Sequence, residues 1–452
     1  MSKILNVDFN NITGKIKPMH AVGQPPMLGT NCERFSYLKE ANIPYARLHD
    51  VGVKKLLPMV DISCIFPDMA MDETDPANYD FEYTDLLVSE LIKNDCPPVF
   101  RLGETIENAI GYGFKPRFIY APKDVQKWAR VCEHIVRHYN EGWADGFEFG
   151  IEYWEIWNEP DNGFQEPDFL SDNPYRDLNQ MWVGTKEQYY ELYAVTSKHL
   201  KSCFGDKIKV GGYASSGLYA IFNEPEKYGI DPCYKKFYRA RYDFFLEFFY
   251  GFLEYVKNEN APIDFFSWHS YSDVDRTVVM GQFVIDTLEK YGFGDIEIHL
   301  NEWNNAHSIE GMGTSYACAH ATAMMIAMHK TKTYMLNYYD ARLTNSTYGG
   351  MFNPITHLPF CLYYGFKAFG ELYALENQVD CSVEGDGIYS IAATDGNTKA
   401  VLLANIGADA DIISSLDGFD VYLIDETHSI QKIDVDSHAF TVKENQVMLI
   451  KK

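Results

Sequence analysis

Tyr153-Trp154-Glu155-Ile156-Trp157-Asn158-Glu159-Pro160-Asp161 is the clearest strand signal in this chain. Aromatic and β-branched residues fill its first half, and the proline stops a strand from continuing. The stretch therefore predicts a buried strand that ends in an amide and a carboxylate, at the point where the chain enters a loop.

A second stretch, Ile296-Glu297-Ile298-His299-Leu300-Asn301-Glu302-Trp303-Asn304-Asn305, has the same design. The period of two in a strand places its Ile and Leu side chains on one face, with Glu302 in phase with them, and His299 is expected to face outward. Glycoside hydrolysis needs one carboxyl group to protonate the leaving oxygen and another to attack or stabilise the sugar carbon. We interpret Glu159 and Glu302 as that pair.

Strands and helices alternate along most of the chain. Helices are predicted from about Asp124 and from a capping box at Thr185–Gln188. This alternation predicts a (β/α)₈ barrel in which Glu159 closes the fourth strand and Glu302 the seventh, at the strand ends where barrel active sites are built. Besides the two quoted stretches, strands are predicted at 16–24, 45–50, 98–104, 208–212, 263–271 and 333–339.

The sequence changes character after about Tyr373. The segment 377–386 is acidic and turn-rich, and the short strands that follow are separated by Gly, Asn and Asp turns. We predict a catalytic barrel over 15–374 and a small antiparallel β-sandwich over 375–452, to which residues 1–14 could add a strand. The sandwich strands are predicted at 388–393, 400–404, 421–424, 440–442 and 447–450.

Composition excludes several classes of function. The net charge of −25 disfavours nucleic acid and anionic membranes as partners, because phosphates would be repelled. Nine scattered cysteines without a Cys-x-x-Cys pair argue against a disulfide framework or a zinc ribbon. The N-terminus lacks a signal-peptide pattern and no run reaches membrane-helix length, so a soluble, cytoplasmic protein is expected. No metal and no cofactor are predicted.

At these motifs the chain resembles the retaining glycosidases of clan A, and most closely glycoside hydrolase family 39, the β-xylosidase and α-L-iduronidase family. The resemblance runs in patches from about residue 16 to 374, and the family's β-sandwich would account for the C-terminal strands. The segments that carry it are 154–161, 301–304, Arg47-Leu48-His49, Ser267-Trp268-His269-Ser270-Tyr271, Tyr348-Gly349-Gly350-Met351-Phe352 and 363–369.

The resemblance implies a retaining double displacement on an oligosaccharide or glycoside. Glu302 would be the nucleophile that attacks the anomeric carbon. Glu159 would donate a proton to the leaving oxygen and then deprotonate the incoming water. Asn158 would hydrogen-bond the sugar 2-OH.

The resemblance also implies roles for the side chains around this pair. Tyr271 would orient Glu302 and help to keep it ionised. His269 and His49 would bind hydroxyls or tune Glu159. Trp157 and Trp303 would form part of a wall on which the sugar stacks.

The sequence departs from the xylosidases of the family at the rim of the site. Arg101-Leu102-Gly103-Glu104-Thr105 replaces their third-strand pattern, Asp50 follows His49, and Asp340-Ala341-Arg342-Leu343 lacks their paired acidic residues. A β-xylosidase-like enzyme that removes terminal sugars is therefore one reading. Another clan A enzyme, such as an α-L-arabinofuranosidase or an endo-glycanase, and a non-catalytic carbohydrate-binding pseudoenzyme are the alternatives. The sugar, exo or endo action and the oligomeric state stay open.

Overall fold

The computed structural model describes residues 2–26, 32–49, 51, 59–105, 119–163, 181–222, 235–305, 311–342, 348 and 350–452. Asp50, Leu343 and Gly349, which the sequence analysis singled out, lie outside these described residues. Within them, no helix is both long enough and apolar enough to cross a membrane.

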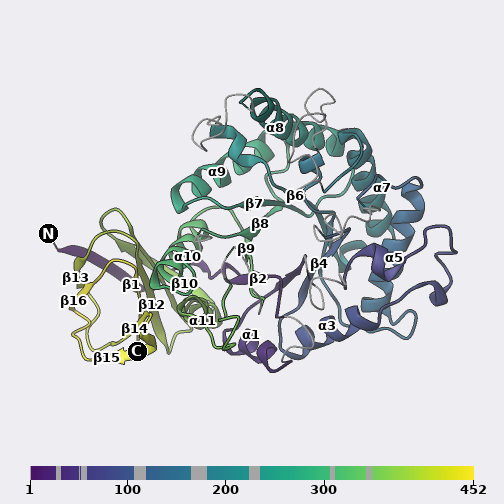
Figure 1. Cartoon of the computed structure of the whole chain (residues 1–452). Helices are drawn as coiled ribbons and strands as arrows, with labels where there is room; N and C mark the ends of the chain where they lie inside the picture. Colours follow the sequence, from purple (N-terminus) through teal and green to yellow (C-terminus); the bar gives the residue numbers. More distant parts are fainter. Residues whose placement is uncertain are drawn as a thin grey trace.

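Eight parallel strands close into a barrel, which confirms the predicted fold (Figure 1). The first barrel strand pairs with both the second and the last, Ala21 lying beside Asn337 and Val22 beside Ala46. The strands are β2 (Ala21–Gly23), β3 (Ala46–Leu48), β4 (Pro98–Leu102), β5 (Tyr153–Ile156), β6 (Lys209–Ser215), β7 (Phe265–Ser270), β8 (Glu297–Trp303) and β9 (Met335–Tyr338).

Helices surround the barrel, and their ends follow the local capping signals. Asp124 accepts a hydrogen bond from the Lys127 N–H at the start of α5, and Thr185 and Gln188 form the predicted capping box of α7. The helices are α1 (Ser36–Glu40), α2 (Ile62–Ile65), α3 (Glu82–Lys93), α5 (Val125–Glu141), α7 (Lys186–Phe204), α8 (Lys235–Asn258), α9 (Val274–Tyr291), α10 (Ser315–His329) and α11 (Cys361–Ala374).

The barrel interior has an apolar floor and a polar layer above it. Ala21, Val99, Tyr153, Phe265 and Met335 pack together at the N-terminal ends of the strands. Two residues further along each strand the inward side chains are mostly polar, so the candidate site rests on a polar platform. The fully or almost fully buried members of this platform are Arg47, Arg101, Glu155, Ser267, Asn301 and Asn337.

The eight C-terminal strands and the N-terminal strand β1 form one curled, nine-stranded sheet in the order β15-β14-β17-β12-β11-β10-β1-β13-β16. The sheet is mixed, because β1 runs antiparallel to β10 and parallel to β13. Its strands are β1 (Lys3–Lys15), β10 (Asn377–Val383), β11 (Ile388–Thr394), β12 (Lys399–Asn405), β13 (Ala410–Ser414), β14 (Asp420–Asp425), β15 (His428–Ile433), β16 (Ala439–Val442) and β17 (Gln446–Lys451).

Three strands of this sheet, β10, β13 and β15, were not predicted from the sequence. The segment read as acidic and turn-rich contains β10, and its partner β1 lies in the N-terminal segment that was expected to be able to add a strand. Strand β10 buries little besides Val379, so hydrophobic alternation could not reveal it.

The two faces of the sheet belong to different cores. Ala392, Val401 and Leu403 pack with one another inside the curl of the sheet, whereas Ile391 and Leu402 join the core of the barrel domain. Helices α10 and α11 lie between the sheet and the barrel (Figure 1). Central strands buried on both faces therefore read as nearly continuous apolar runs.

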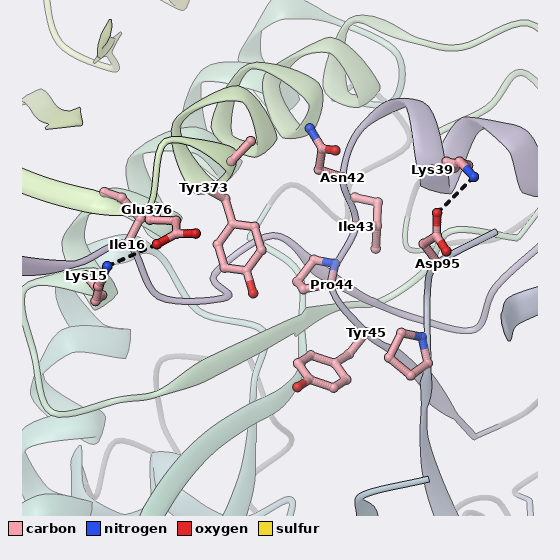
Figure 2. Close-up of a pocket in the computed structure, with 12 residues that line it drawn as sticks. Lys15, Ile16, Lys39, Asn42, Ile43, Pro44, Tyr45, Asp95, Tyr373 and Glu376 are labelled. Carbon is pink, nitrogen blue, oxygen red and sulfur yellow. Dashed lines mark hydrogen bonds and ion pairs between the residues drawn. The ribbon is translucent and has the colours of Figure 1, made fainter. Parts of the chain in front are cut away.

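A cavity of about 780 Å³ opens at the N-terminal ends of β3 and β4 (Figure 2). Tyr45 and Tyr373 face it, and the ion pairs Lys15–Glu376 and Lys39–Asp95 stand at its edges. It lies at the opposite end of the barrel from the strand ends that carry Glu159 and Glu302, so it is not the candidate active site.

Gly370 tests how tightly α11 packs against the end of α1. A Cβ at this position would stand 1.9 Å from the Ala41 carbonyl oxygen, which belongs to the backbone and cannot swing away. We expect Gly370→Ala to lower the free energy of unfolding by about 2 kcal/mol or more in urea titrations, despite its better helix propensity. Gly281→Ala in α9 is the matched control, because a Cβ there meets the flexible end of Met328, and a loss as large as that of Gly370→Ala would contradict the argument.

Candidate active site

Glu159 reaches the barrel mouth through a bend in the backbone just after β5. Trp157 and Glu159 both adopt left-handed backbone conformations, with φ of 71° and 46°. Such conformations cost a non-glycine residue about 1–3 kcal/mol and persist where the surroundings hold them. Here the Trp157 N–H donates to the Leu102 carbonyl at 2.8 Å, and the Glu159 N–H donates to the Ala214 carbonyl at 3.2 Å.

Glu302 reaches the same space through an irregularity in β8. Trp268 of β7 lies beside Leu300, but His269 lies beside Glu302, so β8 contains one extra residue between these two pairs. This bulge turns Glu302 inward, next to His269, whereas strict alternation would leave it on the helix-facing side with Leu300. The predicted phase was therefore wrong, although the predicted position of Glu302 at a strand end holds.

His299 also departs from the prediction. The sequence analysis placed it on an outward face, but its ring is fully buried and stacks on Phe265, with ring centroids 4.6 Å apart. Its Nε2 lies 3.0 Å from a Glu297 carboxylate oxygen. His299 therefore belongs to the barrel floor beneath the site.

Arg47 links the residues of β5 and the turn after it to Glu302 of β8. Its guanidinium donates to Glu155 Oε2 at 2.7 Å, to Asn158 Oδ1 at 2.6 Å and to Glu302 Oε2 at 3.1 Å. The side chain is 1% exposed, and Glu155 is fully buried and also accepts from Ser267 Oγ at 2.6 Å. The pairing explains how these charges are tolerated inside the barrel.

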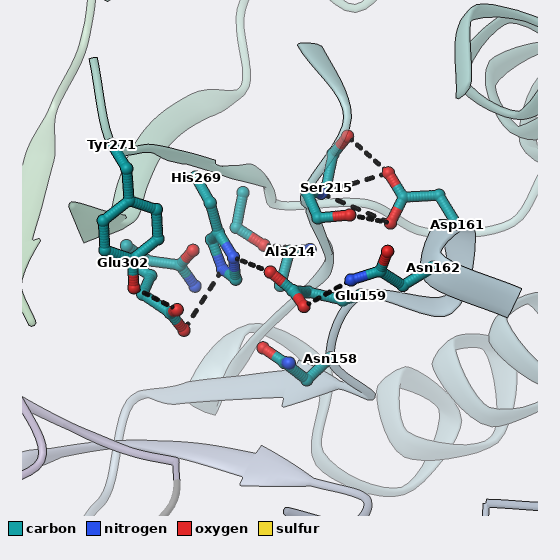
Figure 3. A network of polar contacts seen from close by, with 12 residues as sticks. Asn158, Glu159, Asp161, Asn162, Ala214, Ser215, His269, Tyr271 and Glu302 are labelled. Carbon is teal, nitrogen blue, oxygen red and sulfur yellow. Dashed lines mark hydrogen bonds and ion pairs between the residues drawn. The ribbon is translucent and has the colours of Figure 1, made fainter. Parts of the chain in front are cut away.

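Tyr271 holds the other oxygen of Glu302. Its hydroxyl donates to Glu302 Oε1 at 2.6 Å (Figure 3). Burial, and then the charge of Glu302, raise the pKa of Tyr271 well above its usual value, so the phenol stays protonated and remains a donor. The orienting contact expected for Tyr271 is therefore present.

His269 stands between the two candidate carboxyl groups (Figure 3). Its Nδ1 lies 2.8 Å from Glu159 Oε1, and its Nε2 lies 3.8 Å from Glu302 Oε2. A carboxylate oxygen of each glutamate and a ring nitrogen of His269 all lie within 4.8 Å of one another. Burial lowers the pKa of His269, against the opposing charge of Glu302, which favours the neutral ring.

Asp161 and Asn162 also lie in the surroundings of Glu159. Asp161 is fully buried and accepts from Ser215 Oγ at 2.8 Å and from the backbone and hydroxyl of Ser216. Burial, followed by the nearby charge of Glu159, raises the pKa of Asp161 to about 6. Asn162 Nδ2 donates to Glu159 Oε2 at 3.0 Å.

His49 lies within the same charged environment. It is 3% exposed, and burial lowers its pKa well below the usual value, with further lowering by Arg47, Arg101 and His269. A neutral imidazole here can donate or accept a hydrogen bond, as a sugar hydroxyl requires, and its contact with a sugar remains a prediction.

Trp157 and Trp303 do not form the expected stacking wall. Both indoles are buried, at 1% and 0% exposure. Trp157 Nε1 donates to the Met181 carbonyl at 2.7 Å, and its ring packs against Trp182 at 5.1 Å between centroids. Trp303 packs against Tyr338 and Phe366. Neither ring offers a face to a ligand, so both are core residues.

Sequence reasoning missed the supports of the site. It named Arg47 within a motif without giving it a role, and it gave none to Glu155, Asn301 or Asn162. Glu155 carried a usable signal, since a carboxylate in the middle of an apolar strand is almost never fully buried unless it is paired. Asn301 donates to this same carboxylate.

One group of side chains away from the site could bind a divalent cation. Glu133 of α5 and His199 and Cys203 of α7 offer donor atoms within 4.8 Å of one another. Glu133 is already paired, because Arg137 donates to it at 2.7 Å and His199 lies 2.6 Å from its other oxygen. We assign no metal to this group.

Comparison with known proteins adds a family to this geometry. The family model "Glycosyl hydrolases family 39" matches residues 34–327. A β-xylosidase from Geobacillus stearothermophilus is 25% identical over 218 residues, which cover 46% of this chain and 34% of that protein, so the match spans about a third of the relative's length.

Two solved structures share the fold over nearly the whole chain. A glucosidase from Croceicoccus marinus has a TM-score of 0.73 at 20% identity, covering 100% of this chain and 98% of that one. A monomeric β-xylosidase from Caulobacter crescentus CB15 has a TM-score of 0.67 at 16% identity, covering 99% of each chain.

The Arg47 network predicts a large effect on stability. Arg47→Met removes one partner of a buried ion pair and should lower the free energy of unfolding by about 3–5 kcal/mol in urea titrations followed by circular dichroism. The double variant Arg47→Met with Glu155→Met should lose less than the sum of the two single losses, because no unpaired Glu155 remains. Lys15→Met is the control, since the Lys15–Glu376 pair is 65% and 72% exposed and should contribute less than about 1 kcal/mol. Equal losses in Arg47→Met and Lys15→Met would refute the network's role.

Proposed function

Because the chain belongs to glycoside hydrolase family 39, we propose that it removes terminal sugars from oligosaccharides or glycosides with retention of anomeric configuration. Glu302 is the nucleophile and Glu159 the general acid and base. One carboxylate oxygen of Glu302 and one of Glu159 lie within 4.8 Å of each other, and this closeness carries the proposal. Retaining enzymes hold the two groups about 5–5.5 Å apart, whereas inverting enzymes leave about 6.5–9.5 Å for a water molecule.

In the first step Glu302 attacks the anomeric carbon while Glu159 gives its proton to the glycosidic oxygen. The bond from the anomeric carbon to that oxygen breaks, and the aglycone leaves as an alcohol. Arg47 and Tyr271 hold one oxygen each of Glu302, so the nucleophile is oriented before substrate arrives.

In the second step a water molecule attacks the same carbon and passes its proton to Glu159. The bond between the sugar and Glu302 breaks, which restores both carboxyl groups. His269 contacts Glu159 and faces Glu302, so a neutral ring at this point separates the two carboxyl groups without neutralising either of them.

Asn158 supports the binding of a sugar hydroxyl. Its amide oxygen accepts from Arg47 at 2.6 Å, which leaves the amide N–H₂ as a donor. A donor beside the nucleophile suits the sugar 2-OH, whose hydrogen bonds strengthen in the oxocarbenium-like transition state.

The names of the relatives guide the choice of sugar. Two of the similar proteins are β-xylosidases and one is a glucosidase. We propose a β-D-xyloside as the first substrate to test and a β-D-glucoside as the second. The panel should also contain α-L-arabinofuranoside, α-L-arabinopyranoside, β-D-galactoside and α-L-iduronide.

The decisive experiment measures hydrolysis of aryl glycosides by the wild type and two variants. Glu159→Ala should lose about 10²–10⁴-fold on poor leaving groups, and Glu302→Ala about 10⁴-fold or more on every substrate. Azide should rescue Glu302→Ala by attacking the anomeric carbon from the vacated side, giving a glycosyl azide of inverted configuration. NMR of the wild-type product should show retention. An inverted wild-type product, or an active Glu302→Ala, would refute the proposed mechanism.

Tyr271→Phe isolates one hydrogen bond to the nucleophile. The bond to a charged group is worth about 1.5–3 kcal/mol, so kcat/KM should fall by about 10–100-fold. Loss of the donor makes Glu302 hold its proton to higher pH, so the acidic limb of the kcat/KM profile should shift to higher pH. Tyr316→Phe is the control, because that exposed ring lies on α10 outside this network. An unmoved acidic limb in Tyr271→Phe would contradict the assignment.

A further inference from the structure

The turn directly after Glu159 returns a side chain to the Glu159 carboxyl. Asn162 lies in the 3₁₀ turn Pro160–Gly163, and its backbone N–H donates to the Glu159 carbonyl at 3.0 Å. Its side-chain Nδ2 donates to Glu159 Oε2, also at 3.0 Å. His269 contacts the other oxygen, Oε1, so the carboxyl group is held from two sides (Figure 3).

Arg241 of α8 fixes the orientation of the Asn162 amide. Its guanidinium donates to Asn162 Oδ1 and lies over the ring of Phe245, 5.1 Å from the centroid. A guanidinium has donors and no acceptor, so the amide oxygen must face Arg241 and the amide N–H₂ must face Glu159. The two hydrogen bonds therefore run in one direction: Arg241 donates to Asn162, and Asn162 donates to Glu159.

Resting on the assignment of Glu159 as acid and base, we propose that Asn162, anchored by Arg241, is a positioning residue that keeps Glu159 Oε2 unprotonated and directs the catalytic proton to Oε1. An N–H that points at Oε2 cannot accept a hydrogen from it. The neutral carboxyl group therefore carries its hydrogen on Oε1. That oxygen contacts His269 Nδ1 at 2.8 Å, and the other ring nitrogen of His269 faces Glu302, so Oε1 is the oxygen on the His269 side of the carboxyl group.

The groups around Glu159 act on its proton in opposite directions. Like charges on Asp161 and Glu302 favour the protonated form, whereas the Asn162 donor and the Arg241 cation favour the carboxylate. The raised pKa of Asp161, caused by burial and then by Glu159, agrees with this repulsion. The described titratable and charged side chains around Glu159 are His269 of β7, Glu302 of β8, Asp161 of the same turn, Arg241 of α8 and Tyr219 of the 3₁₀ turn Leu218–Phe222.

Asn162→Ala should therefore shift the pH profile and not merely reduce activity. Without the donor, Glu159 keeps its proton to higher pH, so the basic limb of kcat/KM should rise by roughly one pH unit. Asp161→Asn removes a like charge and should move the same limb to lower pH. A structural defect alone would lower activity in both variants without opposite shifts of the limb.

Arg241→Met provides a second, independent variant. Without Arg241 the Asn162 amide can rotate away from Glu159. The basic limb of kcat/KM should therefore move to higher pH, as in Asn162→Ala, but by a smaller amount. Arg241→Lys keeps the charge and should restore the limb toward the wild-type position. Lys198→Met removes an exposed cation on α7 that pairs with Glu259, and it should leave the limb unmoved.

The profiles are measured on an aryl glycoside that the wild type hydrolyses, with folding checked by circular dichroism. Glu159→Ala is run in parallel and tests the proposed function by itself. If Glu159→Ala is impaired but Asn162→Ala leaves the basic limb in place, this inference fails and the proposed function stands. If Asn162→Ala does not fold, an unmoved limb in Arg241→Met overturns the inference and a raised limb supports it.

Discussion

The Arg47 guanidinium is the contact on which the geometry of the site depends. It lies inside the barrel and binds one group on β5, one just after it and one on β8. A buried cation is costly unless its hydrogen bonds are satisfied, and here Glu155, Asn158 and Glu302 share them. The position of the candidate nucleophile is therefore set by the inner layer of the barrel before any ligand binds, which is the preorganisation that catalysis by fixed charges requires.

The aromatic core supports the same geometry from outside the barrel. Trp157 was expected to stack on a sugar, but its indole is anchored between Trp128, Trp182 and the Met181 carbonyl. That packing holds the backbone in the left-handed conformations that aim Glu159 inward. The buried tryptophan thus acts on the site through the backbone, because a conformation that costs about 1–3 kcal/mol needs rigid surroundings to persist.

The sequence was informative wherever short-range pattern determines structure. Alternating strands and helices predicted the barrel, and the polar residues that end two apolar strands pointed to Glu159 and Glu302 as candidates. The phase of Glu302 was missed, because a bulge depends on the register with β7 and not on β8 alone. The partners of Arg47 were missed for a similar reason: Glu155 stands 108 positions away and Glu302 stands 255 positions away, and the barrel closure brings them together. Strand β10 was missed because it forms by pairing with β1 in the N-terminal segment, and the polar segment 377–386 does not reveal this pairing by itself.

The pairing of β1 with β10 also explains how the C-terminal sheet supports the barrel. The first and last barrel strands, β2 and β9, pair with each other and form a seam. Strand β1 precedes β2 in the chain, and β10 follows β9 through α11, so the β1–β10 pair lies beside this seam. Lys15 pairs with Asn377, and the Ile16 N–H donates to the Glu376 carbonyl at 2.7 Å. The sheet also contacts α10, the helix that follows β8. Glu426 accepts 2.7 Å hydrogen bonds from the backbone N–H and the hydroxyl of Ser315, the first residue of α10. The β2–β9 pairing closes the barrel. The sheet is joined to it at two places, beside that seam and at the first turn of α10, which makes it a structural support of the barrel.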